Sequence, residues 1–332
     1  MVYPCWILVD TGKIGTENQA VGLAERLGWP FSVHPIDLPC LALKALHKKY
    51  VQRLECLPYP KIIIAAGRRS QPVATLFKKY HPEVFLIALL NPQKPLDLFD
   101  LVIAPEHDKL QGSNVLSTLG VLHRITETKL KESLQQENFP TLRRPLLGVL
   151  MGGVSKHYSW TRSVTENLAA HFPPFIPLTI LRFRVFLDAL RSLDQAGWGI
   201  LVLPSRRTPP WLIQELEQCA QETNIIIKKG NGAFNPYTSV LAASDALLVT
   251  ADSVSMISEA CATRKPVYIF PLSGFSKKLS ALHAAFYKAE RARPFQGFIE
   301  HWIPPQEDNT LEATIIEKVE SFFCHTQTAT GY

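Results

Sequence analysis

The strongest candidate for a ligand site in this chain is the serine-rich stretch 250–260, with the sequence TADSVSMISEA. Ser253, or Asp252 before it, can cap a helix that begins here, and Ser255 falls in the first turn of that helix. Such a helix start is typical of a diphosphate site, because its free N–H groups point at the ligand. Glu259 follows one to two turns later, where a carboxylate can bind both hydroxyls of a ribose. An ordinary capped helix is the alternative interpretation.

Other turns of the second half also bring polar or flexible residues to the ends of predicted strands. An arginine pair is of particular interest there, since guanidinium groups neutralise phosphate charge. These residues are Gly152 and Gly153 after the run 146–151, and Ser205, Arg206 and Arg207 after the run 199–203. Asn235 begins an Asn-Pro-Tyr motif, which either borders a base pocket or simply starts a helix.

The first half carries a glycine loop between its first predicted strand and helix, which we interpret as an acceptor or anion loop. The glycines allow tight turns, Thr16 can cap the helix, and Glu17 is the candidate general base. The loop residues are Gly12, Lys13, Gly15, Thr16, Glu17 and Asn18. A structural turn followed by a capped helix would explain the same residues.

Two further turns of the first half contain charged residues at strand ends. Arg68, Arg69 and Ser70 meet a helix start, so they predict an anion site, with a solvated basic turn as the alternative. His107, next to Asp108, is a weaker candidate base, because such a neighbour pair is more often a hydrogen-bonded turn.

The elements that must position these residues are continuous apolar runs, each followed by a polar turn and a helical pattern. Runs without alternation are typical of strands buried on both faces of a parallel sheet. We expect strands at residues 6–9, 61–66, 84–90, 101–104, 146–151, 199–203, 224–227, 246–250 and 266–270. Helices such as 16–27 and 209–223 lie between them. Open parallel sheets bind ligands beyond the carboxyl ends of their strands, which is where the candidate residues fall.

The repeated strand and helix pattern predicts two Rossmann-like, doubly wound α/β domains. A break at 137–145 interrupts both periodicities and marks the boundary. We therefore expect an N-terminal domain at residues 1–140, a C-terminal domain at 141–310 and a final segment at 311–332. The helix of that segment, near 311–323, could pack back on the first domain.

Charge and composition narrow the classes of protein. With 46% hydrophobic and 19% charged residues, the chain has the composition of an ordinary folded protein. Residues 1–144 contain 18 Lys and Arg against 13 Asp and Glu, whereas residues 145–332 contain 17 against 16. The positive excess of the first half favours anionic partners such as phosphates or acidic lipid.

Several motifs are missing from the sequence. The six cysteines form no CxxC pair, and no HExxH, EF-hand, P-loop, GxSxG or DxD motif is present, so we expect neither a metal nor a bound cofactor. Basic residues are not interleaved with aromatics, which disfavours nucleic acid as a partner. Without a signal-peptide or membrane-span pattern, we expect a cytoplasmic protein.

Seven ordered motifs resemble the mitochondrial fission "elongated mitochondria" family. They are TGKIGTENQ at 11–19, GRRS at 67–70, PEHD at 105–108, GG at 152–153, SRRTP at 205–209, NPY at 235–237 and TADSVSMISEA at 250–260. Only residues 163–190 are longer and more apolar than this resemblance leads us to expect. Bacterial members of the family are commonly described as glycosyltransferases, and plant members recruit a dynamin-related protein in mitochondrial division.

The second half also resembles, more loosely, the donor domain of GT-B glycosyltransferases such as MurG and the Kdo transferases. That resemblance implies two domains facing each other across a cleft that holds a nucleotide sugar. Ser253 and Ser255 would then hold the diphosphate, Glu259 the ribose, and Arg206 would neutralise phosphate charge. The base would be Glu17, or His107 as the weaker candidate. The GGHxxP loop of MurG-like enzymes is absent, and Thr16 stands where its histidine would be.

The resemblance therefore implies a metal-independent, inverting transfer of a sugar from a nucleotide-sugar donor to an envelope lipid or polysaccharide acceptor. A non-catalytic recruitment protein on the same fold is the alternative, and an epimerase is a third possibility. A lipid acceptor would imply peripheral contact with the inner face of the membrane. Lys44, Lys48, Lys49 and Arg53 share a predicted helix and could touch acidic headgroups, although a solvated helix face explains them equally well.

Overall fold

The computed structural model describes residues 3–39, 44–136, 139, 142–160, 182–230, 236–305 and 310–329. Part of the expected break at 137–145, most of the apolar stretch 163–190, and the candidate Asn235 lie outside the described residues. The chain divides into two compact units, which we describe separately. Unit 1 comprises Met1–Arg124 and Glu307–Tyr332, and unit 2 comprises Ile125–Gln306.

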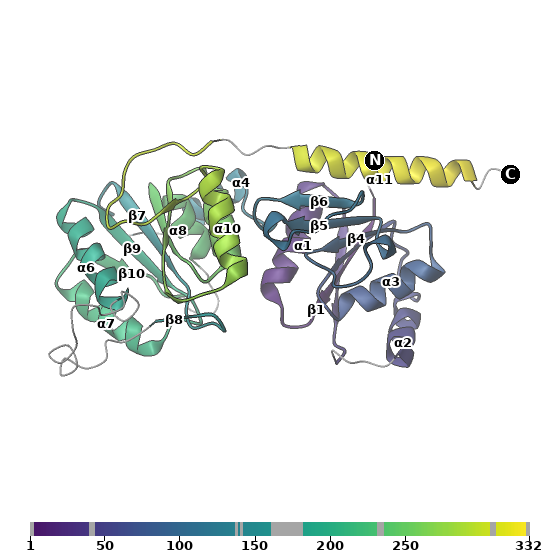
Figure 1. Ribbon diagram of the computed structural model, residues 1–332, viewed down its shortest axis with the longest axis horizontal. Helices are drawn as coiled ribbons and strands as arrows, with labels where there is room; N and C mark the ends of the chain where they lie inside the picture. The colour runs from purple at the N-terminus through teal and green to yellow at the C-terminus, as the bar shows by residue number, and fades with distance from the viewer. Residues whose placement is uncertain are drawn as a thin grey trace. The chain divides into compact units, whose positions relative to one another are not determined.

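Unit 1 is built around a six-stranded parallel sheet with the order β2-β1-β3-β4-β5-β6 (Figure 1). Its strands are β1 (Cys5–Asp10), β2 (Phe31–Ile36), β3 (Ile62–Ala66), β4 (Phe85–Leu89), β5 (Leu101–Pro105) and β6 (Val115–Thr118). Its helices are α1 (Ile14–Arg26), α2 (Lys44–Leu54), α3 (Ser70–Tyr80) and α11 (Thr310–Ala329), with short 3-10 turns η1 (Leu96–Leu98) and η2 (Glu106–Asp108).

The central strands of unit 1 are buried on both faces, which explains their continuous apolar sequence. Along β1, alternate residues enter two separate cores: Ile7 joins the core under α1 and α11, whereas Leu8 joins the core under α2 and α3. Ile7 is in register with Ile64 of β3, which belongs to the same core. The sheet is therefore the middle layer of three.

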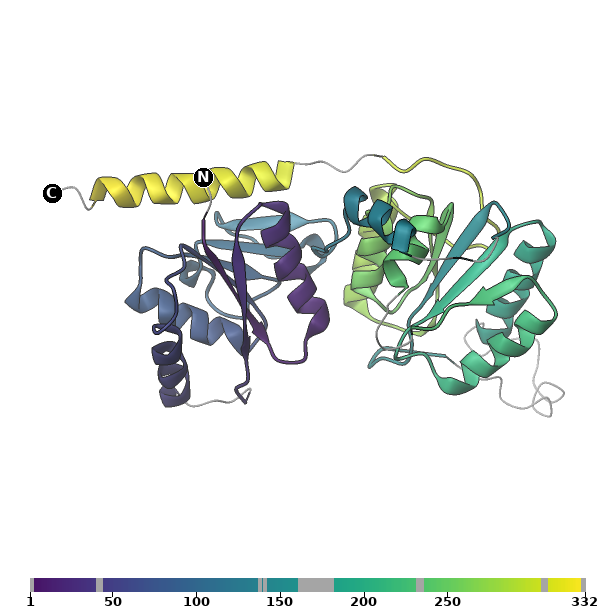
Figure 2. The ribbon, with the colours of Figure 1, turned by 180° about the vertical axis from the view of Figure 1, so that it is seen from behind.

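Helix α11 completes one of these layers, and Figure 2 shows it, in yellow, lying along unit 1. Ile315 and Val319 are fully buried in the core beneath it. Phe323 stacks on Tyr3 with ring centroids 5.0 Å apart, and Phe322 meets Phe85 edge-on at 5.1 Å. None of the described helices is both long and apolar enough to cross a membrane.

Unit 2 contains a second six-stranded parallel sheet, with the order β10-β9-β7-β11-β12-β14. Its strands are β7 (Leu146–Met151), β9 (Gly199–Pro204), β10 (Ile225–Ile227), β11 (Ala246–Thr250), β12 (Val267–Phe270) and β14 (Arg293–Pro294). A separate antiparallel pair joins β8 (Tyr158–Ser159) to β13 (Ser273–Gly274). Its helices are α4 (Glu127–Gln136), α6 (Arg182–Gln195), α7 (Pro210–Gln221), α8 (Tyr237–Ala243), α9 (Val254–Cys261) and α10 (Lys277–Lys288).

The boundary between the units lies before α4, earlier than the expected residue 140. Helix α4 packs on α8, where the hydroxyl of Ser239 donates a 3.3 Å hydrogen bond to the carbonyl of Ser133. Tertiary contact with α8 therefore assigns α4 to unit 2, although it precedes the sequence break.

Candidate functional site

In unit 2 the strand order reverses between β7 and β11, and the loops after these two strands meet. The N–H of Gly152 donates to the Thr250 hydroxyl at 2.7 Å, and the N–H of Gly153 donates to the carboxylate of Asp252 at 3.1 Å. A Cβ on Gly152 would lie 2.0 Å from Asp252 Oδ1, so only glycine fits there. This reversal point is where open α/β sheets bind ligands.

The loop after β9 is tied to the same place. The hydroxyl of Thr208 donates to the carbonyl of Gly152 at 2.7 Å, and the N–H of Ser205 donates to the carbonyl of Met151 at 3.0 Å. Ser205 also accepts a 3.2 Å hydrogen bond from the N–H of Arg207. The structure thus brings together three predicted turns that are far apart in the sequence.

Within this cluster Asp252 and Arg207 are paired with each other. The Asp252 side chain is fully buried and accepts from Arg207 Nη2 at 3.0 Å and from the Thr250 hydroxyl at 2.7 Å. Arg206 is exposed, and no described residue forms an ion pair or hydrogen bond with its guanidinium. Arg206 is therefore the arginine of the pair that is available to an anionic ligand.

Helix α9 begins at this cluster. Ser253 is its N-cap, and its hydroxyl accepts from the N–H of Met256 at 3.4 Å, while Ser255 is partly exposed in the first turn. The alternative cap, Asp252, is instead held by Arg207. N–H groups at such a start carry partial positive charge that favours an anion.

Glu259, further along α9, is largely enclosed and lies near Tyr237, the first residue of α8. Burial raises the pKa of Glu259, and the neighbouring Tyr237 hydroxyl opposes that rise. Burial and the nearby Glu259 charge hold the pKa of Tyr237 well above its ordinary value, so the phenol stays protonated. Tyr237 belongs to the predicted Asn-Pro-Tyr motif, but its partner is 22 positions away in the sequence, which leaves no local signal for the contact.

A histidine that sequence analysis did not single out also reaches this site. His283 of α10 donates through Nε2 to the carbonyl of Ala251 at 3.1 Å, in the loop that leads to Ser253. Burial lowers the pKa of His283, which favours the neutral imidazole. No motif marked this residue, because only the packing of α10 brings it to the loop.

In unit 1 the predicted anion turn is occupied by the protein's own carboxylate. Asp10, at the end of β1, accepts from the N–H groups of Arg69 and Ser70, both at 3.0 Å. Ser70 is fully buried, and its hydroxyl donates to the carbonyl of Gly67 at 3.1 Å. The start of α3 is therefore neutralised internally, which leaves the exposed Arg68 as the candidate for contact with a ligand.

The glycine loop of unit 1 differs in one respect from expectation. Helix α1 begins at Ile14 with Lys13 at the N-cap, so Thr16 lies inside the first turn and does not cap the helix. The reason is a tight turn after β1, in which the N–H of Lys13 bonds to the carbonyl of Asp10 at 3.2 Å and Gly12 has a φ of +79°. Glu17 and Asn18 lie in and just after the first turn of α1 and are partly exposed, and Gly15 is exposed.

His107 lies in η2 with its side chain only 1% exposed. Its Nε2 is 3.8 Å from Asp108 Oδ1, whose own side chain is 6% exposed. An acceptor arriving from solvent cannot reach this imidazole, so the geometry favours Glu17 over His107 as the base.

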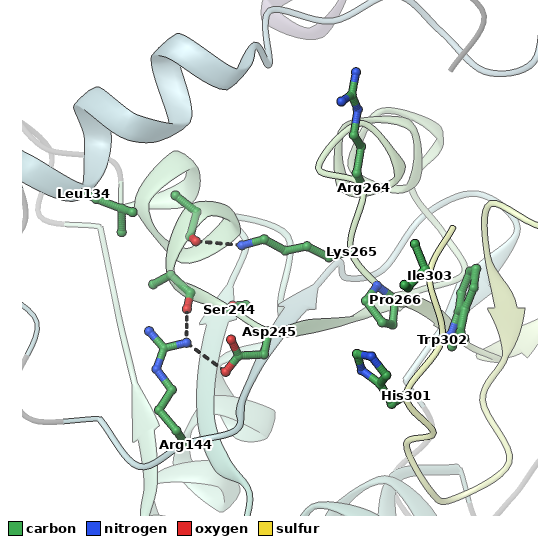
Figure 3. Close-up of a pocket in the computed structure, with 12 residues that line it drawn as sticks. Leu134, Arg144, Ser244, Asp245, Arg264, Lys265, Pro266, His301, Trp302 and Ile303 are labelled. Carbon is green, nitrogen blue, oxygen red and sulfur yellow. Dashed lines mark hydrogen bonds and ion pairs between the residues drawn. The ribbon is translucent and has the colours of Figure 1, made fainter. Parts of the chain in front are cut away.

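A cavity of about 530 Å³ opens at the opposite end of the unit 2 sheet, beside the amino-terminal ends of β11 and β12 (Figure 3). Lys265 donates to the carbonyls of Leu241 and Ala242 at 2.7 and 2.6 Å, and Arg144 donates to Ala243. Both cations therefore satisfy carbonyl groups at the end of α8, and the cavity lies away from the predicted site residues. Elsewhere, too, no group of three or more His, Cys, Asp or Glu side chains that could hold a metal gathers in the described part of the chain.

Two parallel-sheet α/β domains of this kind define a GT-B-like fold. UDP-N-acetylglucosamine 2-epimerase from Neisseria meningitidis, bound to UDP-GlcNAc, is similar with a TM-score of 0.53 and 10% identity, covering 96% of this chain and 100% of that one. MurG from Acinetobacter baumannii is similar with a TM-score of 0.50 and 12% identity, covering 96% and 94%. At identities this low, the structural similarity shows the fold alone. It confirms the predicted GT-B-like α/β fold class.

The family described as Mitochondrial fission ELM1 matches residues 14–173 and 176–318, so the chain belongs to that family, as its motifs predicted. Mitochondrial fission protein ELM1 from Arabidopsis thaliana is 27% identical over 284 residues, which are 76% of this chain. The match spans 62% of the length of that relative.

Proposed function

We propose that this protein is a glycosyltransferase that moves a sugar from a nucleotide-sugar donor to a cell-envelope lipid or polysaccharide acceptor. The observation that carries the proposal is the convergence in unit 2 of the α9 helix start, the exposed Arg206 and the Glu259–Tyr237 pair. A nucleotide sugar has a diphosphate and a ribose that match these groups. The epimerase of the same fold, bound to UDP-GlcNAc, supports the choice of ligand.

In the proposed reaction the acceptor hydroxyl attacks the anomeric carbon, and Glu17 takes the hydroxyl proton. The bond from that carbon to the diphosphate oxygen breaks, and the nucleoside diphosphate leaves with inversion at the sugar. The α9 N–H groups and Arg206 stabilise the charge that develops on the leaving diphosphate. They supply positive charge that a divalent cation provides in other transferases, so the proposed mechanism needs no metal and no bound cofactor.

The first experiment is a thermal-shift screen of the full chain against UDP-, GDP-, ADP- and CMP-sugars. We expect one nucleotide class to stabilise the protein, and Arg206→Gln and Glu259→Gln to weaken that effect. Arg264→Gln is the matched control. Arg264 is exposed and lies just before β12, at the amino-terminal ends of the strands and away from the proposed donor residues. Absence of stabilisation by every nucleotide class would overturn the donor assignment.

The second experiment tests the base. Glu17→Gln is expected to abolish transfer while donor-induced stabilisation survives, because Glu17 lies in unit 1 and the proposed donor residues lie in unit 2. Product analysis without acceptor separates a transferase from an epimerase, which would convert the donor sugar by itself. Undiminished turnover of Glu17→Gln would remove that residue from the mechanism.

A recruitment protein without catalysis is the second candidate, and family membership is the observation that favours it. The Arabidopsis relative is named as a mitochondrial fission protein. A recruitment protein needs no nucleotide sugar, so the absence of any thermal shift with all four nucleotide sugars would favour this candidate. For the transferase, a lipid acceptor would place the reaction at the cytoplasmic face of a membrane.

A further inference from the structure

Unit 2 carries a basic surface with exposed apolar side chains beside the β8–β13 pair. Phe275 is 70% exposed and Val154 is 53% exposed, which are high values for large apolar residues. The same two segments also carry the exposed lysines Lys156, Lys277 and Lys278. We call this surface the β8–β13 patch, and its residues are Val154, Lys156, His157, Phe275, Lys277 and Lys278.

The fold builds the patch from two segments that are more than a hundred positions apart. Strand β8 pairs antiparallel with β13, with Tyr158 opposite Gly274. The N–H of Phe275 donates to the carbonyl of His157 at 3.1 Å. Gly274 has a φ of +123°, and a Cβ there would lie 2.0 Å from that same carbonyl, so the close approach requires glycine.

A tight turn on the β8 side presents the charged residues. The N–H of Ser155 donates to the carbonyl of Tyr158 at 2.8 Å, and the N–H of Tyr158 donates to the Ser155 hydroxyl at 3.0 Å. Lys156 and His157 are the two central residues of this turn, and both are exposed. Backbone hydrogen bonds therefore fix the positions from which the side chains of the patch extend.

The charge of the patch has a single sign. The stretches 152–160 and 271–281 contain three lysines and one histidine but no aspartate or glutamate. Among the described residues no carboxylate pairs with Lys156 or Lys277. Asp252, an acidic residue of the cluster described above, is buried against Arg207.

Two of the lysines stand where they weaken their own helix. Lys277 and Lys278 are the first residues of α10, directly after the Ser276 N-cap. A helix start carries partial positive charge, so cations in the first turn are unfavourable and acidic residues are preferred. Helix stability therefore does not explain Lys277 at this position, whereas an anionic partner does.

We propose that the β8–β13 patch docks on an anionic lipid bilayer. Lysines near such a surface are attracted by its negative potential, and an exposed aromatic ring inserts favourably at the boundary between headgroups and acyl chains. An exposed aromatic side chain in the same surface segments as exposed lysines matches this interface. The proposal extends beyond the proposed function, because the patch shares no residue with the donor site.

The test is co-sedimentation of the full chain with vesicles of phosphatidylcholine alone and of phosphatidylcholine mixed with phosphatidylglycerol. We expect binding to the mixed vesicles only, weakened by added salt. Each of Lys156→Gln, Lys277→Gln and Lys278→Gln should lower the affinity by about fivefold, and Phe275→Ser should also lower it. Phe298→Ser and Lys288→Gln, at exposed positions of unit 2 outside the patch, are the matched controls.

The basic helix α2 provides an internal comparison, because Lys48, Lys49 and Arg53 are also exposed. Loss of vesicle binding in the triple glutamine variant of α2, with binding intact in the patch variants, would overturn the proposal. Equal binding to neutral vesicles, or no binding to either kind, would overturn it as well. The donor-induced thermal shift should be unchanged in the patch variants, which keeps this test separate from the test of the proposed function.

Discussion

Asp252 and Arg207 are joined by a 3.0 Å ion pair in which the Asp252 side chain is fully buried and the Arg207 side chain is 45% exposed. Because Asp252 also accepts from Gly153 and Thr250, the pair locks together the loops after β7, β9 and β11. Unit 1 has a related device, in which Asp10 holds the start of α3. In both units, a buried aspartate at the carboxyl end of a central strand fixes the loops, whereas the neighbouring Arg68 and Arg206 stay exposed.

The two adjacent arginines should therefore respond differently to substitution. Arg207→Gln leaves a buried carboxylate without its cation, and we expect a loss of about 2 kcal/mol, the partial exposure of Arg207 reducing the effect. Arg206→Gln should change stability by less than about 0.5 kcal/mol but weaken donor binding about tenfold. Thermal melting and calorimetric titration of both variants check this, and the reverse pattern would contradict the geometry.

Gly67 and Gly12 form a matched pair of glycines with positive φ in unit 1. A Cβ on Gly67 would lie 2.3 Å from Asp10 Oδ1, whereas a Cβ on Gly12 would meet nothing within 4 Å. Gly12→Ala is expected to cost about 1 kcal/mol from backbone strain alone. Gly67→Ala adds a steric clash and should cost about 3 kcal/mol. Urea denaturation measures both, and equal losses would show that Asp10 does not require the close approach.

The carboxyl of Glu259 should make stability depend on pH. Its pKa is raised above the ordinary value of 4.5, so its contribution to stability is full below that value and is lost as pH rises through the folded-state pKa. Glu259→Gln removes this loss and keeps a side chain of nearly the same size beside Tyr237. We therefore expect the variant to gain stability relative to the wild type as pH is raised from below 4.5 to neutral.

Melting temperatures over a pH series measure this gain. Glu290→Gln, at an exposed carboxyl of the same unit, is the control and should show no such trend. A difference between wild type and Glu259→Gln that stays constant with pH would show that burial of this carboxyl is not coupled to folding.

Neighbouring isoleucines on α11 test whether this helix is part of the core of unit 1. Ile315 is fully buried, whereas Ile316 is 38% exposed. Ile315→Ala should cost about 3 kcal/mol, through lost burial and a residual cavity, and Ile316→Ala less than about 1 kcal/mol. Chemical denaturation of the full chain gives both values. Equal small losses would mean that α11 contributes little to folding.

The internal strands of both sheets could be predicted because burial on both faces leaves a continuous apolar run. The strands β7 and β11 coincide with the predicted runs, and β3 and β12 differ from them by one residue. The strands β2 and β6 were not predicted, since they lie at sheet edges with partly exposed side chains. Pro35 within β2 further obscures its pattern.

The sequence by itself determined the fold class, the family and the loops that carry the candidate site residues, because strand ends and helix starts are local signals. Only the tertiary structure decided which polar groups in those loops remain available. Asp10, Asp252 and Arg207 are held by internal partners, whereas Arg206 and Glu17 stay accessible. Arg207 lies 45 positions from Asp252, and Arg69 and Ser70 lie 59 and 60 positions from Asp10, so these contacts form only after the sheets bring parallel strand ends together.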